Sequence, residues 1–243
     1  RVAVVSPHLD DAVFSLGASI RGAVRRGTRV EVLTVLAGLP DSDRPAGPSN
    51  AKAGFSTSGE AARARRREDE RACALLGAEP VWLGFPDDPY DGQPAGDDVA
   101  RALAVHLAGC DAVLIPAFPL AHPDHLWVSR VALGVLEPGQ VVGLYVEQPY
   151  ASWNALSRAR PIMPRASRDD APARLGIAVR PHEAWRRGAA GAADWVAKAR
   201  ASREYRSQLA VLRRFPQLRV AAYEALRGGE SVLWCRLRPP SGL

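Results

Sequence analysis

The chain has 243 residues, of which 47% are hydrophobic and 24% are charged, and its formal net charge is +6. These values are ordinary for a soluble globular protein, and the length suffices for one substantial core, so we expect a single domain over residues 1–243. No basic run is interleaved with aromatic residues, so we expect no nucleic-acid partner. No apolar stretch approaches the length of a membrane span.

The three cysteines, Cys73, Cys110 and Cys235, stand far apart, mostly beside small or apolar residues. This placement favours buried, reduced thiols over disulfides or a cysteine zinc site. The chain opens on an apolar segment, without the basic and apolar regions of a secretory signal. We therefore expect a cytoplasmic protein, and the sequence leaves its oligomeric state open.

Short apolar segments alternate with amphipathic segments along the chain. Residues 2–6 form a β-branched apolar run and predict a buried parallel strand. Residues 10–26 predict a helix, because apolar residues recur there every three or four positions, and residues 30–36 predict the next strand. Together these segments predict one right-handed βαβ unit.

The alternation resumes after a long loop at 38–58, which is rich in Pro, Gly, Ser, Asp and Asn. Helices are expected at 58–76, 97–108, 126–136 and 192–213, and strands at 80–83, 111–117, 141–146 and 231–237. A second loop, 149–174, contains four prolines. We expect a Rossmann-like, doubly wound α/β fold with a mostly parallel sheet and helices on both faces, in which the two loops shape the substrate site.

Two clusters of histidine and aspartate follow two of the expected strands. They are Pro7-His8-Leu9-Asp10-Asp11 and His122-Pro123-Asp124-His125. In the Rossmann strand order the first and fourth strands are neighbours, so the two clusters should meet at the carboxyl edge of the sheet. Catalytic zinc prefers three protein ligands and leaves one position to water, and His8, Asp11 and His125 supply such a set.

The spacing inside each cluster predicts different roles for neighbouring side chains. Asp10 and Asp11 diverge on the first turn of a helix, so only one easily binds the metal, while the other is placed to act as a general base. His122 and His125 are three residues apart and share a helical face. One of these histidines can bind metal while the other reaches the substrate carbonyl.

Both clusters also have structural interpretations. Asp10 and Asp11 suit the N-terminal cap of a helix, and residues 122–125 suit a turn with solvated histidines. The occurrence of both clusters after neighbouring strands favours the metal site. A dinucleotide site is disfavoured, because no Gly-x-Gly-x-x-Gly follows the first strand and an aspartate pair would repel a pyrophosphate. His106 and His182 are given no functional role.

These residues resemble the PIG-L/LmbE family of zinc-dependent N-deacetylases, which remove acyl groups from N-acetylglucosamine-containing substrates. The resemblance covers nearly the whole chain, and the two clusters carry it most strongly. Weaker support comes from Arg65-x-x-Glu68 with Leu76-Gly77, from Leu83-Gly84-Phe85-Pro86-Asp87, and from the stretch between Lys198 and Ser207-Gln208. Leu9 with Ala12-Val13, and Glu147-Gln148-Pro149-Tyr150, look closer to members from glycopeptide and other natural-product glycan pathways than to the thiol-cofactor enzymes.

The resemblance implies a role for each residue of the two clusters. His8, Asp11 and His125 would bind zinc, and Asp10 would be the general base. His122, oriented by Asp124, would stabilise the oxyanion or protonate the leaving amine.

The resemblance also indicates where substrate would bind. Arg65 and Asp87 fall where family members bind sugar hydroxyls, with Asp88 as the alternative to Asp87. Tyr150 follows the fifth strand, where it could stack on an extended substrate with Tyr145 and Trp153, although aromatic side chains there could equally belong to the core. At Ala12 many relatives carry Glu, which puts the substrate subclass in doubt.

The expected activity is zinc-dependent hydrolysis of an N-acetyl amide on an amino-sugar-containing small molecule. One alternative substrate is a non-sugar or longer-chain N-acyl biosynthetic intermediate. A non-catalytic glycan-binding protein is disfavoured, because the ligand and acid–base residues are intact. Fe²⁺ could occupy the same site in the cell, but oxygen chemistry is disfavoured because the alternating strands and helices do not suit a β-sandwich.

Overall fold

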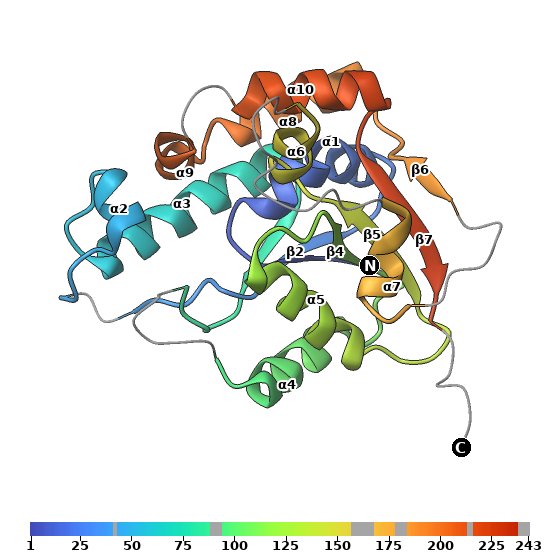
Figure 1. Cartoon of the computed structure of the whole chain (residues 1–243), viewed down its shortest axis with the longest axis horizontal. Coiled ribbons are helices and arrows are strands. Elements are labelled where there is room, and N and C mark those ends of the chain that lie inside the picture. Colours follow the sequence, from blue (N-terminus) through green and yellow to red (C-terminus); the bar gives the residue numbers. More distant parts are fainter. Residues whose placement is uncertain (41–42, 88–93, 157–167, 178–183, 213–215, 238–243) are drawn as a thin grey trace.

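Seven strands form one sheet in the computed structural model, which describes residues 1–40, 43–87, 94–156, 168–177, 184–212 and 216–237 (Figure 1). The strands are β1 (Val2–Ser6), β2 (Val30–Thr34), β3 (Glu79–Trp82), β4 (Ala112–Phe118), β5 (Val141–Val146), β6 (Trp185–Arg187) and β7 (Ser231–Arg236). Their order across the sheet is β3-β2-β1-β4-β5-β7-β6. Strands β1 to β5 are parallel, and β7 pairs antiparallel with both β5 and β6.

Helices cover both faces of this sheet (Figure 1). They are α1 (Asp11–Arg25), α2 (Pro48–Lys52), α3 (Ser58–Leu76), α4 (Gly96–Leu107), α5 (Pro123–Gly134), α6 (Tyr150–Leu156), α7 (Ala171–Arg174), α8 (Ala192–Ser202), α9 (Arg206–Val211) and α10 (Pro216–Arg227), with a 3-10 turn at Arg168–Asp170. The expected Rossmann-like, doubly wound fold is confirmed. Strand β1 lies between β2 and β4, so the first and fourth strands are neighbours as expected.

Alternate residues of each strand face opposite sides of the sheet and build two cores. Val5 of β1 belongs to the core that includes Leu103 of α4 and Val128 of α5. Val4 belongs to the other core, which includes Leu16 of α1 and residues of α3 and α8. Full burial of each such side chain contributes about 1.5–3 kcal/mol, so the two cores fix the strand order that positions the carboxyl edge.

The expected helix at 192–213 is wrong, because residues 203–205 separate α8 from α9. The break lets Tyr205 turn inward and donate its hydroxyl proton to Oδ1 of Asp69 at 2.6 Å. It also lets Ser207 donate from its backbone N–H and hydroxyl to Glu68, at 3.0 and 2.6 Å. These buried hydrogen bonds outweigh the continuation of the helix.

Other departures lie in the two loops and near the C-terminus. The loop at 38–58 contains α2, and the loop at 149–174 contains α6, α7 and the 3-10 turn. Helix α5 begins at Pro123 rather than at Leu126, because proline suits the first helical position. Helix α10 and the short edge strand β6 are not predicted from the sequence.

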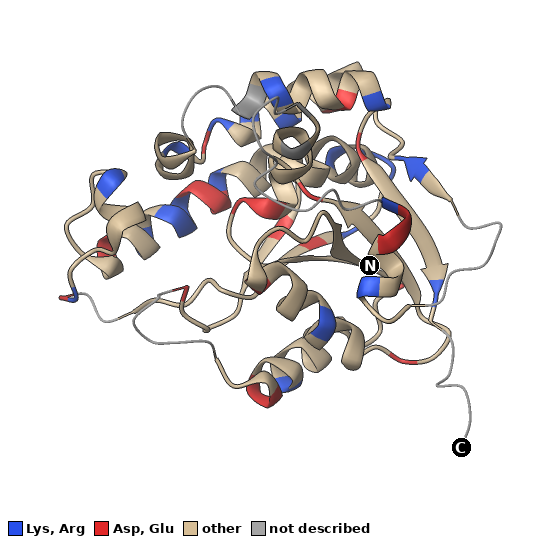
Figure 2. Cartoon of the chain, viewed as in Figure 1, with Lys and Arg blue, Asp and Glu red and all other residues tan. Residues whose placement is uncertain are grey.

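Three further features of the fold are the state of the cysteines, the apolarity of the helices and the charges on α3. The three cysteines are buried thiols that form no disulfide, as predicted. Among the helices of the described segments, none has the length and apolarity needed to cross a membrane. Charged residues on α3 lie in successive blocks of basic and acidic side chains (Figure 2).

Candidate metal and catalytic site

A tight turn after β1 positions the first cluster. Ser6 donates its hydroxyl proton to the carbonyl oxygen of His8 at 2.6 Å, and its oxygen accepts the backbone N–H of Ala12 at 3.1 Å. The backbone N–H of His8 donates to Oδ2 of Asp11 at 2.9 Å. These bonds direct the His8 and Asp11 side chains toward His125, which follows the carboxyl end of β4.

Three atoms from the two clusters converge at one point. Nδ1 of His8 lies 3.2 Å from Oδ2 of Asp11 and 3.2 Å from Nε2 of His125, and the His125 and Asp11 atoms are 3.3 Å apart. Ligands about 2.0–2.1 Å from a tetrahedral zinc ion lie roughly 3.3 Å from one another. The two nitrogens and one oxygen therefore have the spacing and chemical type of a three-ligand metal site.

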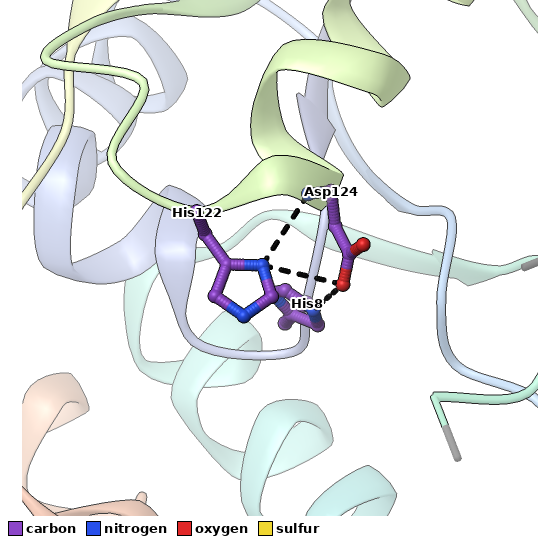
Figure 3. A group of neighbouring side chains, drawn as sticks. All are labelled: His8, His122 and Asp124. Atoms are coloured by element: carbon purple, nitrogen blue, oxygen red, sulfur yellow. Dashed lines mark hydrogen bonds and ion pairs between the residues drawn. The ribbon is translucent and has the colours of Figure 1, made fainter. Parts of the chain in front are cut away.

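The surroundings of His8 leave its Nδ1 atom available to a metal. Nε2 of His8 lies 3.3 Å from Oδ2 of Asp124 (Figure 3). The same nitrogen lies 3.6 Å from Oδ1 of Asp87. A neutral His8 that donates its Nε2 proton to Asp124 presents the lone pair of Nδ1 to Asp11 and His125. Such a carboxylate partner on the far nitrogen is usual for histidines that bind metals.

His8, His122 and Asp124 form a second group with the spacing of metal ligands (Figure 3). In this group His122 is the N-cap of α5, and its Nδ1 atom accepts the backbone N–H of Asp124 at 3.3 Å. The His122 side chain is 44% exposed, whereas that of His125 is fully buried. Of the two groups, that of His8, Asp11 and His125 is therefore the more deeply buried.

Asp10 caps the start of α1 with its backbone, but its side chain makes no capping hydrogen bond with any described residue. The side chain instead lines the cavity beside the cluster. Burial, together with the charge of Asp11, raises the pKa of Asp10 to about 7. A carboxyl group with this pKa can take up and release a proton near neutral pH, as general acid–base chemistry requires.

Two further aspartates of the site, Asp11 and Asp124, are held in their charged forms. Burial alone would raise the pKa of Asp11, but the charges and hydrogen bonds of His125 and His8 outweigh it and hold that pKa well below its usual range. Hydrogen bonds with His122 and His8 lower the pKa of Asp124. Both aspartates are therefore carboxylates at neutral pH.

A cavity of about 300 Å³ lies over the cluster and brings most of the predicted site residues together. It is lined by His8, Asp10, Asp11, Gly47, Pro48, Ser49, Asn50, Arg65, Asp87, His122, Pro149, Tyr150, Gln208, Val211 and Leu212. His125 lies beneath this cavity rather than in its wall. Helices α2 and α9 contribute one side of the cavity, so parts of both the first loop and the late helical segment border the site.

The predicted substrate residues differ in how well they are placed. Nη1 of Arg65 pairs with Oδ2 of Asp87 at 3.2 Å, and both residues line the cavity. The Tyr150 ring stands perpendicular to the His125 ring, with 5.3 Å between centroids, and Trp153 packs on Tyr150. Tyr145 belongs to the core instead, because its buried hydroxyl donates to the carbonyl oxygen of Val5 at 2.9 Å.

Two residues given no role by the sequence stand beside the predicted ones. Gln208 of α9 accepts hydrogen bonds from Nε and Nη2 of Arg65, at 3.0 and 3.1 Å, when its amide oxygen faces that side chain. Glu147, directly after β5, faces His125. The sequence could have indicated Glu147 by its place directly after β5, at the same edge of the sheet as the two clusters. Asp88 and His182 lie outside the described residues.

Comparisons with known proteins identify the family of the chain. Residues 3–136 match the PIG-L family model, described as GlcNAc-PI de-N-acetylase. The chain is 35% identical over 198 residues to 2'-N-acetylparomamine deacetylase of Streptomyces fradiae, covering 70% of this chain and 67% of that one.

Solved structures show the same fold over nearly the whole chain. A40926 pseudoaglycone deacetylase Dbv21 matches with a TM-score of 0.72 and 25% identity, covering 99% of each chain. A structure described as the zinc-inhibited form of teicoplanin deacetylase Orf2 matches with a TM-score of 0.72 and 22% identity, covering 100% of both. The resemblance to natural-product deacetylases seen in the sequence is confirmed. The chain belongs to the PIG-L family of N-deacetylases, hydrolases that cleave amide bonds.

Proposed function

We propose that the chain removes the N-acetyl group from an amino-sugar-containing small molecule of a natural-product pathway. The observation that carries this proposal is the convergence of His8, Asp11 and His125 beneath a cavity that Asp10 lines. The Streptomyces fradiae relative is named for an N-acetylated paromamine, which supports an amino-sugar substrate. Three buried cysteines that form no disulfide suit the reducing cytoplasm in which we place this reaction.

We assign a divalent metal, zinc, to His8, Asp11 and His125. Bound there, the metal would supply Lewis-acid polarisation of the acyl carbonyl and a lowered pKa for the attacking water. The same residues could hold Fe²⁺, since two imidazoles and one carboxylate suit both ions.

The protein residues of the cavity perform the remaining steps. Asp10 takes a proton from the attacking water as the water oxygen bonds to the acyl carbon. The C–N bond then breaks, and the departing amine takes a proton from Asp10 or His122, leaving acetate and a free amine. Nδ1 of His122 faces the backbone N–H and the carboxylate of Asp124, so the other ring nitrogen, Nε2, is the one that can donate to the developing oxyanion or to the amine.

Arg65, Asp87 and Gln208 are assigned to the sugar hydroxyls. Their fixed carboxylate, guanidinium and amide groups supply donors and acceptors along one wall of the cavity. Tyr150 closes the opposite side against His125. We propose that residues 1–243 act as one domain, in which segments 38–58 and 149–174 shape this cavity.

The experiment for this proposal is acetate release from a panel of N-acetylated amino sugars. The protein is assayed as purified, after chelation, and after zinc is returned in steps from below one equivalent, because the Orf2 relative has a zinc-inhibited form. We expect release to disappear with chelation and to return near one equivalent. Metal-replete protein that releases no acetate from any member would refute the proposal.

One observation favours a second substrate, an amide with a longer acyl chain. A cavity of about 480 Å³ between α8 and α10 shares Pro149 with the site cavity and is lined largely by apolar side chains, including Phe14, Trp195, Leu218 and Val220. A hydrolysis rate that rises from N-acetyl to N-octanoyl amides would favour this substrate. The variant Ala221→Trp, which fills the apolar cavity, should then lower the rate for the octanoyl amide alone. An enzyme with its highest rate on acetyl amides would exclude it.

A further inference from the structure

A buried carboxylate lies behind His125, on the side away from the metal position. Glu147 follows β5 directly and is 0% exposed. Its Oε2 atom lies 3.3 Å from Nδ1 of His125 and accepts the backbone N–H of Leu120 at 3.2 Å. The backbone N–H of Glu147 donates to the carbonyl oxygen of Phe118 at 2.6 Å. Glu147 is thus anchored through both its backbone and its side chain.

Unpaired polar atoms mark this contact. Nδ1 of His125 and Oε1 of Glu147 are buried, and within the described part of the chain neither atom has a hydrogen-bond partner. Burial of an unpaired polar atom costs free energy, so each instance in a native protein needs an explanation. Here the two atoms belong to side chains that face each other, and hydrogen bonds of a catalytic site often tighten only when the site is loaded.

The direction of the His125 ring explains which atom should carry its proton. Nε2 points at Nδ1 of His8 and Oδ2 of Asp11, so a metal bound there needs the lone pair of Nε2. A neutral His125 must then carry its proton on Nδ1. The carboxylate that faces this atom is Glu147.

The backbone at Leu120 is arranged to hold that carboxylate in place. Leu120 has φ +54°, a left-handed conformation that is unfavourable for a residue with a branched side chain. In this conformation its N–H donates to Glu147. Leu120, in its strained conformation, therefore holds the Glu147 carboxylate in place behind His125.

We propose that Glu147 is a positioning residue for the metal site. It accepts the Nδ1 proton of His125, fixes the tautomer and direction of the ring, and so strengthens metal binding through Nε2. This inference rests on the proposed function, because it takes His125 as a metal ligand. It adds a residue that contacts neither substrate nor metal.

The first test reads the His125 tautomer in the wild-type holoprotein by ¹⁵N NMR of labelled histidine. The chain has five histidines, so the imidazole signals can be assigned by substituting them one at a time. We expect a proton on Nδ1 of His125 in the zinc-loaded protein, with Nε2 bound to the metal. A proton on Nε2 would overturn the inference, whatever the activity of the enzyme.

The second test measures zinc affinity by competition with a chromophoric chelator. Glu147→Gln keeps an oxygen for Leu120 and removes the charge that faces His125, so we expect affinity to fall about 10- to 100-fold. Glu68→Gln is the matched control, because Glu68 is also buried and accepts the backbone N–H and the hydroxyl proton of Ser207. Among the described residues, no hydrogen bond or ion pair joins Glu68 to a histidine. We expect the control to keep wild-type affinity.

The outcomes separate this inference from the proposed function. Equal affinities for wild type and Glu147→Gln would overturn the role of Glu147 while leaving the metal-dependent hydrolase intact. Wild-type protein that binds no divalent metal would overturn both. If Glu147→Gln does not fold, the wild-type tautomer measurement decides the question alone.

Discussion

Nε2 of His125 lies 3.2 Å from Nδ1 of His8, although the two residues are 117 positions apart in the chain. The pairing of β1 with β4 produces this proximity, because each histidine follows one of these neighbouring strands at the same edge of the sheet. The close approach of two imidazole nitrogens to one carboxylate oxygen is the geometry on which the proposed activity depends.

Asp10→Asn is expected to lower kcat about 10²- to 10⁴-fold, because the amide cannot accept the proton of the attacking water. Metal content should stay at the wild-type level, since the Asp10 side chain lies outside the converging group of ligand atoms. Acetate release and elemental analysis on the same preparation measure both quantities. A metal-replete Asp10→Asn enzyme with full activity would show that another group is the base.

His125→Ala is expected to lose both metal and activity. The variant removes one of the three converging atoms and leaves Oδ2 of Asp11 with His8 alone. Elemental analysis after gel filtration, with Asp10→Asn as the metal-binding control, measures the loss. Retention of one tightly bound metal by folded His125→Ala would place the metal elsewhere.

Arg65→Ala is expected to raise KM about 10-fold with a smaller change in kcat, because Arg65 pairs with Asp87 and Gln208 in the cavity wall. Arg67→Ala, an exposed position on the same helix, is the matched control and should leave both constants unchanged. Steady-state kinetics with the best substrate of the panel make the comparison. An Arg65→Ala enzyme with unaltered KM would remove Arg65 from the substrate site.

The folded protein should lose stability as pH rises from about 4 to about 6, through Asp69. Burial raises the pKa of Asp69 to about 6, although hydrogen bonds from Trp82, Tyr205 and Cys73 oppose the shift. The unfolded chain ionises Asp69 near its ordinary pKa of about 3.8, so rising pH favours unfolding until the folded state also ionises. The stability is fully present below the unfolded pKa, and about 3 kcal/mol is lost once pH has risen past the folded pKa.

Urea denaturation of wild type and Asp69→Asn across this pH range tests that assignment. The difference in unfolding free energy between the two proteins should shrink as pH rises, since asparagine does not titrate. A difference that stays constant from pH 4 to pH 7 would contradict the raised pKa of Asp69.

Much of the fold follows from local patterns, because β1, β2, β4 and β5 are mostly apolar runs buried on both faces and the helices between them are amphipathic. The sequence does not show the break between α8 and α9, since it depends on Tyr205 and Ser207 reaching acids on α3. Strand β6 could not be predicted because it is short, lies at the edge of the sheet and has the sequence Trp-Arg-Arg, with no alternation of apolar residues.

The proximity of the two clusters could be predicted because strand order alone brings His8, Asp11 and His125 together. Glu147 and Gln208 could not be assigned, since their contacts depend on the direction of side chains from distant elements. The sequence allowed Tyr145 either to contact the substrate or to pack in the core. Its buried hydrogen bond to Val5 places it in the core.

The most direct measurement is a crystal structure of the zinc-loaded protein, with anomalous data collected on both sides of the zinc absorption edge. The account predicts one strong peak about 2.0–2.2 Å from Nδ1 of His8, Oδ2 of Asp11 and Nε2 of His125. A peak instead between His8, His122 and Asp124 would contradict it, as would the absence of any peak from fully loaded crystals.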